Sequence, residues 1–211
     1  MARKKQLSSG LYSVHPMIPY AQAVINNMPE KTGRSLEEWV ALTIADGPEG
    51  EKERRAWLKK EHKVGGTTAM MISERSVGKG KEMTDPDEYL RAAEEYVEAM
   101  YSAKVNLRPI HDALIDRARA LGEVRICPCK TIVPLYREHV SAEIKPATIK
   151  RIDLGLALRN HKGRKGKRLI VTAGLEKGNR ITHRIPLSAL EEVDEEVSRW
   201  LQLAYNLAEP D

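Results

Sequence analysis

The spacing of apolar residues changes at Gly122, and this change constrains the fold more than any other feature of the sequence. Before Gly122, apolar residues recur every three or four positions, as they do along one face of a helix. After it they alternate with polar residues, as they do along one face of a strand. The clearest alternating run is Ile152, Leu154, Leu156 and Leu158. We therefore expect an α+β fold: a small N-terminal helical bundle, then a mostly antiparallel sheet of about five strands covered by helices.

The helical bundle is expected over residues 17–76. Ser35 and Glu38 have the spacing of a capping box, in which side chain and backbone cap each other at a helix start. Gly33 suits the left-handed residue that ends the preceding helix. The sequence thus predicts a helix at 20–30, a second after Ser35, a third at 51–62 and a short fourth helix.

Residues 77–85 combine glycines and charges without apolar periodicity, and we predict a linker there. The sequence Asp-Pro-Asp-Glu at 85–88 then supplies an N-cap, a proline for the first turn and a glutamate at the third position. The second domain, residues 86–211, is expected to hold two helices, a sheet and a final helix from Ser188. Its strands are predicted at 124–126, 140–144, 152–158, 168–172 and 180–187.

The composition is that of a globular protein, with 211 residues, 41% hydrophobic and 31% charged. No apolar run approaches the roughly 20 residues that cross a bilayer, and no apolar stretch follows the basic start. This indicates a cytoplasmic protein that does not contact membranes. Cys127 and Cys129 are too close for an unstrained disulfide and supply at most half of a zinc site. We expect reduced, partly buried thiols, no metal and no cofactor.

Two families of bacterial domains of unknown function resemble this chain. Lys-Thr-Gly at 31–33, Ser35, Trp39 and Trp-Leu-Lys-x-Glu-His-x-x-Gly at 57–65 are similar to the motifs of a short helical domain. Residues 107–110, 130–131, 151–156 and 182–184 are similar to a second domain that often follows it. The resemblance covers nearly the whole chain after residue 17 and implies two domains. It implies little about function, although relatives of the second domain are found beside restriction-type and nuclease modules.

The sequence Leu-Lys-Lys-Glu-His-Lys-Val-Gly-Gly-Thr-Thr at 58–68 resembles a helix-hairpin-helix turn. In such turns a Gly-x-Gly hairpin points amides at a phosphate, and the next helix N-terminus adds its dipole. The relatives have glycines two apart, whereas Gly65 and Gly66 are adjacent here. Thr67 occupies the second site, and Thr67 or Thr68 is expected to cap the helix. The candidate contacts are Lys59, Lys60, Lys63, Gly65, Gly66 and Thr67; a plain corner between helices is the alternative.

Basic charge is concentrated in residues 3–5 and 159–168, although the net charge is only +5. Residues 1–85 carry 14 Lys and Arg against 11 Asp and Glu, and residues 86–211 carry 21 against 19, so neither half is a polycation. The segment 159–168 suits a polyanion, but a solvated hairpin tip has the same composition. Its candidate contacts to nucleic acid are Lys162, Arg164, Lys165, Lys167 and Arg168.

A second candidate site lies in the sheet. His183 shares a strand face with Ile181 and Ile185, which is typical of a buried histidine satisfied by one hydrogen bond. The functional interpretation groups it with other polar residues as a pocket for an anion. Arg151 and Asp153 could instead pair with each other, because they share the face opposite Ile152. The group consists of Lys130, Arg151, Asp153 and His183.

No Ser, Cys or pair of carboxylates has the arrangement of a nucleophile or of an acid and base, so an enzyme is the third choice. The first hypothesis is a non-enzymatic module that contacts the phosphates of DNA or RNA through the turn and the basic segment. The alternative is a protein that binds a small anion or another protein through the sheet domain. Nothing in the sequence specifies the oligomeric state.

Overall fold

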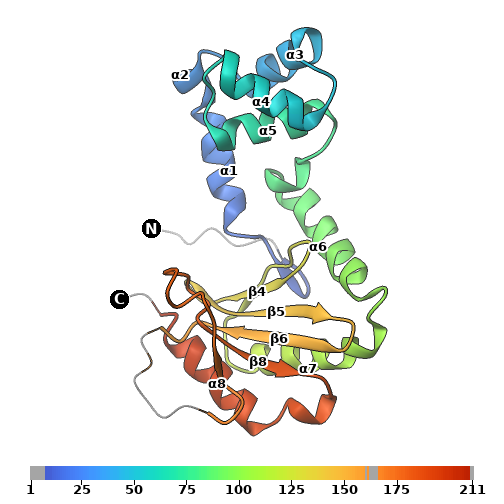
Figure 1. Cartoon of the computed structure of the whole chain (residues 1–211), viewed down its shortest axis with the longest axis vertical. Coiled ribbons are helices and arrows are strands. Elements are labelled where there is room, and N and C mark those ends of the chain that lie inside the picture. The colour runs from blue at the N-terminus through green and yellow to red at the C-terminus, as the bar shows by residue number, and fades with distance from the viewer. Residues whose placement is uncertain (1–7, 160, 162–165, 210–211) are drawn as a thin grey trace. The chain divides into compact units, whose positions relative to one another are not determined.

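The computed structural model describes residues 8–159, 161 and 166–209, and it divides into two compact units (Figure 1). The helical unit consists of residues 14–92. The described residues of the sheet unit are 8–13, 93–159, 161 and 166–209. The division falls inside α6 (Pro86–Tyr101), whereas the predicted linker at 77–85 lies within the helical unit and contains the 3-10 helix η1 (Lys81–Met83). That these residues separate two folding units stays a prediction.

Five helices precede η1 in the helical unit: α1 (Met17–Asn26), α2 (Met28–Thr32), α3 (Leu36–Asp46), α4 (Glu51–Glu61) and α5 (Gly66–Ser76). The helix expected at 20–30 is interrupted at Asn27 and forms α1 and α2. Gly33 ends α2 with a φ of 78°, as predicted. The capping box is confirmed, since Ser35 Oγ accepts from the Glu38 N–H at 3.2 Å and Glu38 accepts from the Ser35 N–H at 2.7 Å.

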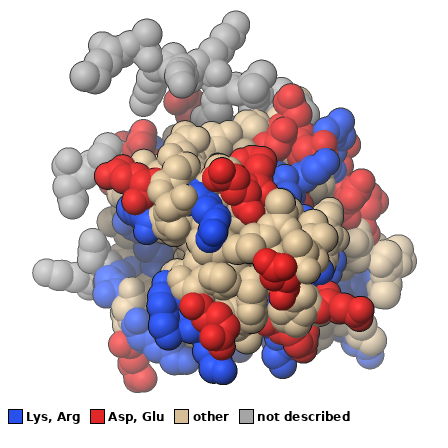
Figure 2. Space-filling model, turned by 90° about the horizontal axis from the view of Figure 1, so that it is seen from above, with Lys and Arg blue, Asp and Glu red and all other residues tan. Residues whose placement is uncertain are grey.

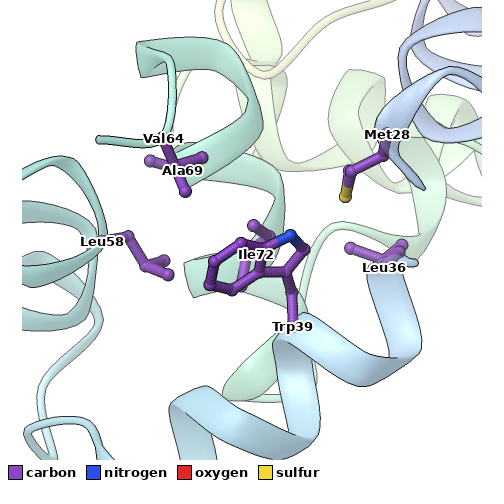
Figure 3. Packing of buried hydrophobic residues seen from close by; sticks show 7 residues of the cluster. All are labelled: Met28, Leu36, Trp39, Leu58, Val64, Ala69 and Ile72. Atoms are coloured by element: carbon purple, nitrogen blue, oxygen red, sulfur yellow. The ribbon is translucent and has the colours of Figure 1, made fainter. Parts of the chain in front are cut away.

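The core of the helical unit gathers around the indole of Trp39 (Figure 3). Only 3% of Trp39 is exposed, and Leu58 and Ile72 are fully buried beside it. Burying side chains of this size contributes about 1.5–3 kcal/mol each, which offsets the entropy lost on ordering short helices. The cluster consists of Met28, Leu36, Trp39, Leu58, Val64, Ala69 and Ile72.

The sheet unit contains a six-stranded sheet in the order β3-β4-β5-β6-β8-β7, with every neighbouring pair antiparallel. Its strands are β3 (Arg125–Ile126), β4 (Val133–Tyr136), β5 (Val140–Thr148), β6 (Arg151–Leu156), β7 (Ile170–Val171) and β8 (His183–Leu187). The short strands β1 (Ser8–Ser9) and β2 (Tyr12–Ser13) form a separate hairpin. The helical elements are the second part of α6, η2 (Val105–Leu107), α7 (Arg108–Arg119), η3 (Leu190–Glu192) and α8 (Glu195–Asn206).

Helices α7 and α8 cover one face of this sheet (Figure 1). Alternate residues of β5 and β6, such as Ile144 and Leu154, are fully buried, and α8 buries Val197, Trp200 and Leu201. The α+β fold predicted from the change in spacing is therefore confirmed. The packed face is continuous because residues two apart along a strand point the same way.

Three details of the sheet unit differ from the prediction. Strand β4 was not among the predicted strands. It contains Pro134, which has no N–H to donate but whose carbonyl accepts from the Cys127 N–H at 3.0 Å. The final helix begins at Glu195 rather than after Ser188, and the Asp194 side chain accepts from the Glu196 and Val197 N–H groups. The predicted strand at 168–172 is reduced to the two residues of β7.

Neither cysteine forms a disulfide bond. Burial raises the pKa of the Cys127 thiol to about 12 and also raises the pKa of Cys129. The thiols are therefore protonated near neutral pH and are poor nucleophiles, as expected for structural cysteines. Within the described ranges, no helix combines the length and the apolar character needed to span a membrane.

Candidate functional site

The turn between α4 and α5 is anchored to the core of the helical unit by Val64. Val64 is only 5% exposed, and its N–H donates to the Leu58 carbonyl at 3.2 Å. Among the described residues, Lys63 is the only non-glycine residue with a positive φ, 56°. Its Nζ donates to the Lys60 carbonyl at 2.8 Å. The turn is thus a defined structure and not a loose connection.

Gly65 and Gly66 form the exposed part of this turn. Gly65 has an extended conformation with a φ of −62°, and α5 begins at Gly66. A Cβ added to either glycine would meet no atom within 4 Å, so neither close packing nor a left-handed backbone requires glycine here. The prediction that Thr67 or Thr68 caps α5 is wrong, because no side chain caps this helix. No side chain of the described residues therefore accepts from the N–H groups of its first turn.

A stripe of basic residues leads along α4 toward the turn. Lys52, Arg55 and Lys59 are spaced by three and four positions, which places them on one face of the helix. All three are exposed, and none pairs with an acidic residue in the described part of the chain. Lys60 differs, because its Nζ lies 3.1 Å from Glu61 Oε1. We call Lys52, Arg55 and Lys59 the basic stripe.

Positive and negative charges are mixed on one face of the molecule. Figure 2 shows Lys and Arg interspersed with Asp and Glu over the face seen from above. On this face a polyanion can be attracted only by local groups of unpaired basic residues, because salt screens charges more than about 10 Å apart.

Most residues that carry the resemblance in the helical unit have structural roles. Thr32 Oγ1 accepts from Trp39 Nε1 at 2.7 Å and donates to the Met28 carbonyl at 2.7 Å. The His62 ring lies edge-on to the rings of Trp39 and Trp57, with centroid distances of 5.3 and 4.4 Å. These contacts join α2, α3 and α4 around the core.

The basic segment at 159–168 is only partly free to contact a polyanion. Arg168 Nη2 lies 2.5 Å from Asp194 Oδ1, its Nε lies 3.1 Å from Glu196 Oε2, and its Nη1 donates to the Glu192 carbonyl at 2.9 Å. Partial burial alone would raise the pKa of Asp194, but the Val197 N–H and Arg168 outweigh it and lower this pKa. The charge of Arg168 is thus already balanced within the fold.

Of the other predicted contacts in this segment, Lys167 is exposed. Lys162, Arg164 and Lys165 lie outside the described residues. The segment therefore offers two exposed basic residues that the structure describes, Arg159 and Lys167, whereas the turn and the basic stripe offer several.

The polar group predicted in the sheet is only partly assembled. Asp153 lies between two arginines, with its Oδ1 2.9 Å from Arg151 Nε and its Oδ2 2.7 Å from Arg184 Nη1. The alternative given for the sequence, that Arg151 and Asp153 pair with each other, is what the structure has. Arg184 was not predicted to join this group because it belongs to another strand. Alternation along one strand shows which face a residue is on, but not which residues of other strands lie beside it.

The remaining two residues of that group lie apart from this pair. His183 pairs with Leu156 in the register of β6 and β8, so it points to the opposite face of the sheet from Asp153. Its Nδ1 lies 2.9 Å from Thr182 Oγ1. Lys130 Nζ lies 6.0 Å from the centroid of the Tyr96 ring.

The fold and the site define a two-unit α+β protein with an exposed basic turn. No group of three His, Cys, Asp or Glu residues able to hold a metal occurs within the described part of the chain. Residues 97–208 match the family model named Domain of unknown function (DUF5655), and the chain belongs to this family. Residues 20–75 match a second model, Domain of unknown function (DUF4287), which confirms the predicted two-domain architecture. No curated protein and no solved structure matches the chain.

Proposed function

We propose that this protein binds the phosphate backbone of a nucleic acid through the turn between α4 and α5. The observation that carries the proposal is the uncapped start of α5, where two exposed glycines have no role in packing. A helix N-terminus of this kind directs several N–H donors and a partial positive charge at an anion. Glycine allows a phosphate oxygen to approach those donors closely.

The basic stripe extends the proposed phosphate-binding surface from the turn along α4. Lys52, Arg55 and Lys59 add fixed positive charge along α4, and Lys63 lies in the turn itself. Contacts of this type neutralise phosphates without reading base identity. The proposed function is therefore backbone binding with little sequence preference, to DNA or RNA.

The turn can be tested by Gly66→Val. The added side chain has open space around it in the fold, so the variant should remain folded while covering the N–H groups of the first turn. Losing one hydrogen bond to a charged group corresponds to about 1.5–3 kcal/mol, so binding of a short labelled duplex should weaken at least about tenfold. Fluorescence anisotropy at low salt measures this change, and circular dichroism checks the fold.

Gly66→Ala is the matched control, because it adds one methyl group. It should raise the free energy of unfolding by about 0.5–1 kcal/mol, since alanine restricts the unfolded chain more than glycine does. Its affinity for the duplex should lie between those of the wild type and Gly66→Val. Equal binding by all three folded proteins, or no binding by the wild type even at low salt, would leave the turn as a plain corner between helices.

A further inference from the structure

A cavity of about 410 Å³ lies in the sheet unit, away from the polar group predicted there. Three segments distant in sequence form its wall: Arg159 after β6, Asn179 and Arg180 before β8, and Leu207 to Glu209 after α8. His139, between β4 and β5, completes it. Its volume falls within the range of about 300–1,000 Å³ that small-molecule sites occupy.

The cavity has an excess of positive charge. The Arg180 side chain is exposed and forms no ion pair or hydrogen bond with the described residues. Among the described residues, Arg159 Nη2 donates to main-chain carbonyls alone, those of Asn179 at 3.1 Å and Leu175 at 3.5 Å, and no acidic group there balances its charge. Among the described residues, Glu209 is the single acidic residue of the lining, and it already pairs with Arg137.

The wall is ordered by contacts that do not need a ligand. The Asn179 N–H donates to the Gly174 carbonyl at 2.8 Å, which closes the turn before β8. Gly178 has a φ of 76°, and a Cβ there would lie 3.7 Å from Arg159 Nη2. Arg137 packs over the Tyr205 ring at 4.3 Å, which fixes the partner of Glu209. The two arginines of the cavity are therefore held by a defined backbone.

We infer that this cavity binds a small phosphate monoester. The two guanidinium groups match the charge of a phosphate better than that of a carboxylate, and together with the His139 ring they offer donors to its several acceptor oxygens. Leu207 and Ala157 give the cavity an apolar part, which suits an organic group attached to the phosphate. The site is separate from the turn between α4 and α5, so either can fail without the other.

Isothermal titration with a nucleoside monophosphate, inorganic phosphate and the nucleoside alone tests the inference. The monophosphate should bind with a dissociation constant below about 1 mM, which corresponds to roughly 4 kcal/mol. Inorganic phosphate should bind more weakly, and the nucleoside should give no measurable heat. Binding of acetate or benzoate as tight as that of the monophosphate would overturn the assignment to phosphate.

The matched variants are Arg180→Gln and Arg199→Gln. Both arginines are exposed and lie in the sheet unit, but Arg199 is on α8 and outside the lining. Arg180→Gln should weaken the monophosphate at least tenfold, and Arg199→Gln should leave its affinity unchanged. No binding to the wild type, or equal losses in the two folded variants, would overturn the inference. If a duplex binds Arg180→Gln as tightly as it binds the wild type, the duplex does not depend on the charge of this cavity.

Discussion

Trp39→Ala is expected to lower the free energy of unfolding of the helical unit by about 3–5 kcal/mol, the usual cost of truncating a buried aromatic residue. The indole is 3% exposed at the centre of the core, and its Nε1 donates to Thr32 Oγ1 at 2.7 Å. The ring also contacts His62 edge-on. Truncation therefore removes packing, a hydrogen bond and an aromatic contact together. Urea titration followed by far-ultraviolet circular dichroism measures the loss.

Two further variants serve as comparisons: one removes only the hydrogen bond of the indole, and the other is a control on the surface of α3. Thr32→Val leaves the ring in place but removes the acceptor of its N–H, and it should cost about 1–3 kcal/mol. Ile44→Ala changes a residue of α3 that is 56% exposed, so the free energy of unfolding should change by less than about 0.5 kcal/mol. A loss below 1 kcal/mol for Trp39→Ala would contradict the core described here.

The sheet unit is expected to lose about 3 kcal/mol of stability between pH 6.5 and pH 4, because of His111. Burial lowers the pKa of His111 from 6.5 to about 4, an effect that Arg108 assists and that Asp112 and Glu98 oppose. In this window the unfolded chain binds a proton that the folded chain does not. Stability therefore falls as the pH falls through it, and is retained above pH 6.5.

His111→Gln tests this expectation. Glutamine can still share a hydrogen bond with the Tyr101 hydroxyl, which lies 3.0 Å from His111 Nδ1, but it does not titrate. Urea titrations at pH 7 and pH 4 give the difference in unfolding free energy for each protein. The difference should be smaller in the variant by about 3 kcal/mol. If the unfolding free energy changes equally between pH 7 and pH 4 in both proteins, protonation of His111 does not destabilise the fold, and the prediction is wrong.

Features that depend on a few neighbouring residues could be predicted from the sequence. The capping box of Ser35 and Glu38 needs one helical turn, and Asp85 accepts from the Asp87 and Glu88 N–H groups as expected. The change in the spacing of apolar residues at Gly122 predicted the α+β class. A helix buries one face when apolar residues recur every three or four positions, and a strand buries one face when they alternate with polar residues.

Features that depend on distant residues could not be predicted. Arg168 belongs to a segment rich in basic residues, yet it pairs with Asp194 and Glu196, which lie more than 20 residues later in the chain. Arg180 and Arg159 meet in a cavity only because β6 and β8 are neighbours in the sheet. Gly65 and Gly66 were recognised as a candidate, but their lack of a packing role required the structure.

The salt dependence of duplex binding tests the central claim, contact between the helical unit and phosphates, most directly. The wild type and the variant Lys52→Gln/Arg55→Gln/Lys59→Gln are titrated with a short labelled duplex between 50 and 200 mM salt, with Lys60→Gln as the control for an ion-paired lysine. Each phosphate contact contributes about −0.9 to the slope of log K against log salt, so the triple variant should lose roughly 2–3 units of slope. Lys60→Gln should keep the slope of the wild type. A folded triple variant with the slope of the wild type, or a wild type whose binding does not weaken with salt, would contradict the account.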